Sequence, residues 1–260
     1  MDWIGKIIAA EEKCHQAFFG QTQNLALMRQ VLEATGQERV KAWNALGLEV
    51  HFLPKLVLTA KTSLKGWKKK PEFWFWEQIG AGNIKRRNAS GELASMTEVG
   101  LEGIVALVDT RCKPSYDGGR QMFANDANFL GKLIARLRAD GKLVKYEYGP
   151  QESRFGVSPV EWDNHLRSVV AELLGLPAQR MRLETIIEAN IVPQAYPAMC
   201  PRANDGQTDT WVWYEEFFGD ASNRLVGGDS NYGGLVRVSY NFADGRWRRA
   251  AVRPLGVLAS

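Results

Sequence analysis

Hydrophobic residues recur every three to four positions through the first part of the chain, which is the spacing of amphipathic helices. This pattern covers residues 2–47 and predicts a helical N-terminal region. An apolar stretch at residues 51–59 then predicts a strand that contains Pro54. Residues 71–79 predict a short helix, with Pro71 in its first turn.

The middle of the chain continues with alternating strand and helix signals. Residues 104–110 are a continuous apolar run and predict a buried strand, and a helix is predicted near 126–139. The run Ser158–Glu161 has the order Ser-Pro-Val-Glu, which predicts a capped helix start, and the helix should end at Gly175. A second helix is predicted over 178–190, giving the pair helix-turn-helix proportions.

From about residue 191 the pattern changes to prolines, glycines and short strands. We therefore predict an α+β protein with two parts. Residues 1–150 would form an α-rich region of unassigned role, and residues 151–260 a domain of short antiparallel strands and long loops.

The polar and apolar positions alternate in the segment 235–240, as in a half-buried strand. Val236, Val238 and Tyr240 would pack inward, while Arg237, Ser239 and Asn241 would share the other face. The pair Asp244–Gly245 predicts a hairpin turn, with the returning arm passing through Trp247. The pairs Gly227–Gly228 and Gly233–Gly234 predict positive φ angles or close approach of another strand.

Composition narrows the class of protein. Apolar residues make up 45% of the chain and charged residues 24%, which is typical of a globular protein. The net charge of +4 is compatible with acidic partners and requires none. Cys14, Cys112 and Cys200 form no CxxC pair. The first helix is interrupted by charges, so we expect no signal peptide, no membrane insertion and a cytoplasmic location.

One stretch resembles a known family. The run RLVGGDS at 224–230, followed by AAVRPLGVL at 250–258, resembles the C-type-lectin-like fold of formylglycine-generating-enzyme relatives. It resembles more closely the variable proteins that retroelements diversify in bacteria, archaea and phages, which would be compatible with a phage or prophage origin. The resemblance covers residues 153–260. The chain differs where Asp229–Ser230 replaces the common Ser-Trp, and where Ala251–Arg253 replaces Gly-Phe-Arg.

This resemblance implies a non-enzymatic protein that displays exchangeable side chains on a fixed scaffold. The ligand would be a protein or a cell-surface molecule, and neither a cofactor nor a metal is implied. The implied ligand-binding face consists of Asn223, Asn231, Tyr232, Arg237, Ser239, Asn241, Phe242, Asp244 and Trp247. The implied scaffold residues are Trp211, Gly227, Gly228, Arg253 and Pro254. Neither the identity of the ligand nor the oligomeric state follows from the sequence.

An enzyme of the formylglycine-generating superfamily with unfamiliar chemistry is the first alternative. The oxidase chemistry needs a cysteine pair, but Cys200 is the single cysteine after residue 150. The three histidines, His15, His51 and His165, show no metal-ligand spacing. Asp109 and Asp117 could form a carboxylate pair for a metal, although such aspartates more commonly shape turns.

A nucleic-acid-binding protein is the second alternative. Basic clusters occur at 65–70, 85–87 and 246–249, and the first and last contain Trp67 and Trp247. Basic side chains beside stacking rings are typical of single-strand binding. Lysine-rich loops also serve simply as solvated surface, and we favour that interpretation.

Overall fold

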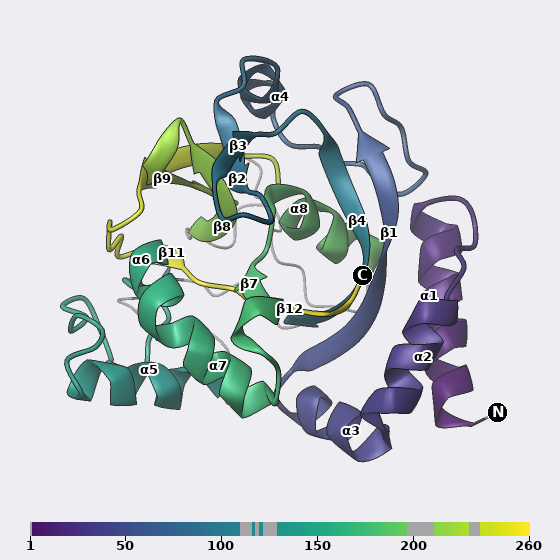
Figure 1. Cartoon of the computed structure of the whole chain (residues 1–260), viewed down its shortest axis with the longest axis horizontal. Helices are drawn as coiled ribbons and strands as arrows, with labels where there is room; N and C mark the ends of the chain where they lie inside the picture. The colour runs from purple at the N-terminus through teal and green to yellow at the C-terminus, as the bar shows by residue number, and fades with distance from the viewer. Residues whose placement is uncertain (1, 110–115, 118–119, 122–128, 197–210, 229–234) are drawn as a thin grey trace.

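The computed structural model describes residues 2–109, 116–117, 120–121, 129–196, 211–228 and 235–260 (Figure 1). Helices and antiparallel sheets are both present, so the α+β class predicted from the sequence is confirmed. No helix in these ranges has the length and apolar character needed to cross a membrane.

The helical elements are α1 (Trp3–Phe18), α2 (Ala26–Thr35), α3 (Gln37–Ala45), α4 (Phe73–Gly80), α5 (Phe129–Ala139), α6 (Pro159–Glu161), the π-helical turn η1 (Trp162–Leu166), α7 (Arg167–Leu174), the 3-10 turn η2 (Ala178–Arg180) and α8 (Ile186–Ala195). The strands are β1 (Leu48–Leu58), β2 (Ile84–Arg87), β3 (Leu93–Ser95), β4 (Val99–Asp109), β5 (Tyr116–Asp117), β6 (Arg120–Gln121), β7 (Met181–Leu183), β8 (Trp211–Phe218), β9 (Asp220–Gly227), β10 (Val238–Phe242), β11 (Ala250–Ala251) and β12 (Pro254–Ala259).

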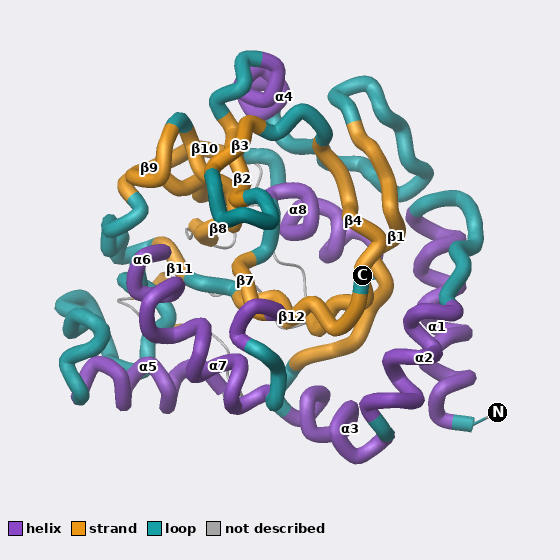
Figure 2. Tube along the Cα trace, viewed as in Figure 1, coloured by secondary structure: helices purple, strands orange, loops and turns teal. Residues whose placement is uncertain are grey.

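The first sheet has the strand order β1-β4-β12-β7 and curves around α8 (Figure 2). Strand β4, one of its two inner strands, is buried on both faces from residue 104 to 109. Val105 and Leu107 pack into the cluster that contains α1, α2 and α3, while Ile104 and Ala106 pack into the cluster that contains α8. This two-sided burial explains why the sequence of β4 is apolar without alternation.

The second sheet has the strand order β10-β9-β8-β2-β3, and β11 pairs with β8 in parallel. Strand β8 alternates between its two faces, because successive side chains of a strand point to opposite sides. Tyr214 packs in the cluster with α8, and Trp213 packs in the cluster with the N-terminal helices. The sheet therefore lies between two apolar layers over the first half of β8.

The two regions expected on either side of residue 150 share both large sheets and both large hydrophobic clusters. Strand β12 pairs with β4 from the N-terminal half, for example Leu255 with Val108. Leu258 lies in the same hydrophobic cluster as Ile4 of α1. A division near residue 150 therefore does not separate two hydrophobic cores.

The predicted helix start at Ser158 is confirmed. The backbone N–H of Glu161 donates to Ser158 Oγ at 3.2 Å, and the Ser158 N–H donates to Glu161 Oε2 at 3.0 Å. The helix includes the π-helical turn η1 and ends at Gly175, where φ is +63°. The predicted helix over 178–190 is wrong in its first half. Residues Met181–Leu183 pair with β12 instead, and a second capping box at Thr185 starts α8.

The predicted hairpin at Asp244–Gly245 is also wrong, because β10 pairs with β9 and the returning segment β11 pairs with β8. The first glycine pair fulfils both expectations. A Cβ on Gly227 would lie 2.3 Å from the carbonyl oxygen of Arg237, and Gly228 has φ +87°.

Candidate functional site

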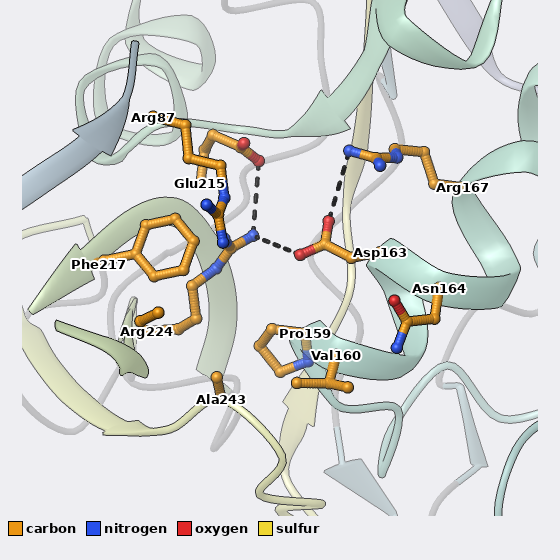
Figure 3. Close-up of a pocket in the computed structure, with 11 residues that line it drawn as sticks. Arg87, Pro159, Val160, Asp163, Asn164, Arg167, Glu215, Phe217, Arg224 and Ala243 are labelled. Carbon is orange, nitrogen blue, oxygen red and sulfur yellow. Dashed lines mark ion pairs between the residues drawn. The ribbon is translucent and has the colours of Figure 1, made fainter. Parts of the chain in front are cut away.

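A pocket of about 320 Å³ opens between the helix that starts at Ser158 and the strands β8 and β9 (Figure 3). We call it the arginine pocket. Its polar wall consists of Arg87, Asp163, Asn164, Arg167, Glu215 and Arg224. Phe217 and the apolar residues Pro159, Val160, Ala221 and Ala243 complete the lining. The π-helical turn brings Asp163 and Asn164 to this position, and strand alternation in β8 brings Glu215 and Phe217 to the same face.

Arg224 is the central residue of the pocket. It lies directly opposite Phe217 in the pairing of β8 with β9, and its guanidinium carbon is 4.2 Å from the centre of the Phe217 ring. The guanidinium of Arg87 also lies over this ring, at 5.1 Å. Two cations therefore lie against one aromatic ring, whose quadrupole attracts both.

Two carboxylates balance Arg224 without forming hydrogen bonds to it. Nη2 of Arg224 is 3.6 Å from Glu215 Oε2 and 3.7 Å from Asp163 Oδ2 (Figure 3). On its other side, Asp163 Oδ1 is 3.6 Å from Nη1 of Arg167. These separations permit Coulomb attraction but exceed normal hydrogen-bond lengths.

The guanidinium of Arg224 is consequently short of acceptors. The residue is only 1% exposed, and within the described part of the chain neither Nε nor Nη2 has a hydrogen-bond partner. A buried donor without an acceptor costs about 1–3 kcal/mol, and more when it is charged. A ligand that supplied acceptor oxygens would remove this cost.

Three residues of the predicted ligand-binding face share the side of the sheet on which the arginine pocket lies. Asn241 is paired with Arg224 and Ser239 with Val226, and paired residues project from the same face. The ring of Trp247 lies 6.0 Å from that of Trp213, whose side chain also projects from this face. We call the arginine pocket together with Ser239, Asn241 and Trp247 the recognition face.

Other predicted face residues lie elsewhere. Phe242 is paired with Asn223 on the opposite side of the sheet, and Phe242 is 62% exposed. Tyr240 was expected to pack inward, yet it is 44% exposed and stacks on Phe218. Arg237 directly precedes β10, and its Nη1 is 3.4 Å from Glu72 Oε2.

The remaining predicted residues divide into three groups. Asp244 is exposed in the turn after β10. Asn231 and Tyr232 fall outside the described residues, as do Cys112, Cys200 and the glycines at 233–234. The predicted scaffold residues are buried or half-buried, namely Trp211, Gly227, Gly228, Arg253 and Pro254. Arg253 donates from Nη2 to the carbonyl oxygen of Asp109 at 2.9 Å, which joins β12 to β4.

The described side chains on which the enzymatic alternative depends contact other residues of the fold. Asp109 is buried and lies 3.2 Å from Nη1 of Arg154, and of Asp117 only the backbone is described. His15 and His51 are buried around Glu11. Within the described ranges, no group of three or more His, Cys, Asp or Glu residues is arranged to hold a metal.

The nucleic-acid alternative requires Trp67 as an accessible stacking ring. It is 5% exposed, and its indole N–H donates to Asn190 Oδ1 at 2.6 Å. Its ring is therefore part of the core, and the basic segment 65–70 lacks that stacking surface.

The sequence does not predict that the pocket residues come together. Arg87, Asp163 and Arg224 are far apart in sequence and meet only through sheet pairing and helix packing. One local signal existed, because Glu215 and Glu216 interrupt the otherwise apolar strand β8. Charges on a buried strand usually have a specific partner. Glu215 lines the pocket, whereas Glu216 is 2% exposed and accepts from the Ile186 N–H at the start of α8.

Comparisons with protein-family models, with curated proteins and with solved structures gave no match to this chain. The likeness to C-type-lectin-like variable proteins accordingly depends on the residues quoted from the sequence.

Proposed function

We propose that this chain is a non-enzymatic binding protein whose recognition face captures a ligand in the arginine pocket. The observation that carries the proposal is the buried Arg224, which lines the pocket while two of its nitrogen atoms lack acceptors among the described residues. A rigid sheet holds this group, and preorganised donors reduce the entropy cost of binding.

The surroundings of the pocket support recognition of a partner. Asn241 lies directly across from Arg224, and Trp247 is 37% exposed on the same side of the sheet. Arginine and aromatic side chains are enriched among the residues that dominate binding energy at protein interfaces. Small polar residues beside them adapt their hydrogen bonds to different ligands.

The proposal retains the C-type-lectin-like scaffold and the retroelement origin that the sequence suggests. Ser239 and Asn241 are residue types that adenine-directed mutagenesis produces, and both lie on the recognition face. Sequencing the DNA downstream of the gene tests this origin. A near-copy of the 3′ end that differs mainly at adenines would support it, and the absence of such a copy and of a nearby reverse transcriptase gene would contradict it.

The binding function is tested by selecting displayed random peptides on the immobilised full-length chain. Enriched peptides should lose binding to an Arg167→Gln variant, because Arg167 lines the pocket at 37% side-chain exposure. Arg136→Gln is the matched control, since Arg136 is an exposed arginine of α5 that does not line the pocket. Peptides that bind both variants equally well, or the lack of any enrichment, would contradict the proposal.

A further inference from the structure

We infer that the group seated in the arginine pocket is a single carboxylate, carried by an acidic side chain of a polypeptide partner. This inference rests on the proposed binding function and specifies its ligand. It follows from the donors in the pocket, from its charge and from the strand beside it.

The pocket has more hydrogen-bond donors than its own acceptors satisfy. The distances from Arg224 to Glu215 and Asp163, and from Arg167 to Asp163, are all 3.6–3.7 Å. The carboxylates thus leave guanidinium N–H groups without short hydrogen bonds. A guanidinium forms paired hydrogen bonds with planar carboxylates, so an incoming carboxylate matches the missing acceptors in shape.

The charge of the pocket selects a monoanion. Three arginines and two acidic residues line it, so the formal charge is 3 − 2 = +1. One ligand carboxylate neutralises this charge. A phosphate dianion would exceed it, and Asp163 and Glu215, whose oxygens lie 3.7 and 3.6 Å from Arg224 Nη2, would repel its second negative charge. Like charges at such distances repel strongly in a partly buried site.

The neighbouring strand favours a polypeptide as the carrier. Among the described strands, β10 is the outermost strand of its sheet, next to β9, which carries Arg224. A short extended segment can add to this edge through main-chain hydrogen bonds near Tyr240, because the Val238 N–H already donates to Glu72 Oε1 and the Ala243 carbonyl accepts from the Val160 N–H. Its alternate side chains then project over the face that carries Asn241 and the pocket. A Glu side chain on that segment would project from the same face of the sheet as Asn241 and Arg224.

Titration of small probes into the full-length chain at constant ionic strength, with binding monitored by NMR, tests this assignment. N-acetylglutamate should bind at least about 10-fold more tightly than N-acetylglutamine, because a charge-assisted pair is worth more than about 1.4 kcal/mol. It should also bind more tightly than inorganic phosphate and N-acetylneuraminate. Arg167→Gln and Arg87→Gln should each weaken it about 10-fold, while Arg136→Gln should not. Arg87 and Arg136 are exposed, so these variants should remain folded.

Each other outcome overturns the inference. Equal binding of N-acetylglutamate and N-acetylglutamine would show that the pocket does not select a carboxylate. Tighter binding of phosphate would assign a phosphoryl ligand, and tighter binding of N-acetylneuraminate would assign an acidic sugar. Peptides enriched on the arginine pocket without any acidic residue would refute the inference but leave the binding function intact. Failure of all peptides to depend on Arg167 would refute the binding function itself.

Discussion

At the scale of single residues, buried charges are the most informative features of this chain. Arg224 is held by Phe217 and by two carboxylates, and the resulting shortage of acceptors defines the candidate site. A second buried group, Glu11, is saturated with partners. It accepts hydrogen bonds from His51 at 2.9 Å, from the hydroxyl of Tyr196 at 2.7 Å and from the Phe52 N–H at 2.7 Å. The contrast marks Glu11 as a structural residue.

The Glu11–His51 pair makes stability depend on pH. Burial would by itself lower the pKa of His51, but the charge of Glu11 and hydrogen bonds to Glu11 and Glu49 raise it from 6.5 to about 9. The stabilisation is therefore complete below pH 6.5 and is lost as pH rises through 9. We predict that the free energy of unfolding falls by about 1–3 kcal/mol over this window.

Urea denaturation at a series of pH values measures this effect. The His51→Gln variant is the control, because it cannot titrate and should lose most of the slope between pH 6.5 and 9. An identical slope in the variant and the original chain would show that other groups cause the dependence.

The pKa of Glu11 affects stability at acidic pH. Burial by itself would raise this pKa, but the charge of His51 and the hydrogen bonds with His15, His51 and Tyr196 lower it from 4.5 to about 2. Its contribution is accordingly present above pH 4.5 and lost toward pH 2.

At the scale of elements, the local signals in the sequence predicted those structures that local interactions determine. The capping box at Ser158 depends on neighbours within a few residues and appears as expected. A strand forms over Val238–Phe242, but the predicted inward packing of Tyr240 is wrong, because that face of β10 is exposed there. Segment 181–183 is predicted as helix but pairs with β12. Local signals do not reveal this pairing, because Leu183 and Pro254 are far apart in the sequence and meet only in the folded chain. The arginine pocket escaped prediction for the same reason.

The cap at Ser158 should contribute measurably to stability. Ser158→Ala removes the acceptor for the Glu161 N–H in a buried setting, so we predict a loss of about 1–2 kcal/mol. Ser168→Ala on α7 is the control, since Ser168 is exposed and its replacement should change stability by less than about 0.5 kcal/mol. Chemical denaturation compares the two, and equal effects would argue against the role of the cap.

At the scale of the whole molecule, the C-terminal strand links the two halves of the sequence. Strand β12 pairs with β4 on one side and β7 on the other, and Arg253, which precedes β12, donates to the carbonyl oxygen of Asp109 at the end of β4. The sheet is thus incomplete without residues from both sides of position 150.

This linkage predicts one cooperative unfolding transition for the full chain. Calorimetry should give equal calorimetric and van't Hoff enthalpies, as expected for a two-state domain. Fragments 1–150 and 151–260 should each fail to unfold cooperatively, because each lacks part of the first sheet. Two separate transitions in the full chain would instead indicate independent domains.

The central claim is that a stable frame carries a recognition face whose residues can be exchanged. It is tested most directly by measuring unfolding free energy and peptide binding together on two variants. Ser239→Ala combined with Asn241→Ala and Arg167→Gln alters the face, and should abolish peptide binding with a stability change below about 1 kcal/mol. Gly227→Ala alters the frame, where the added Cβ meets the Arg237 carbonyl, and should cost more than about 2 kcal/mol. A face variant that unfolds as readily as the Gly227 variant, or that still binds the selected peptides, would contradict the claim.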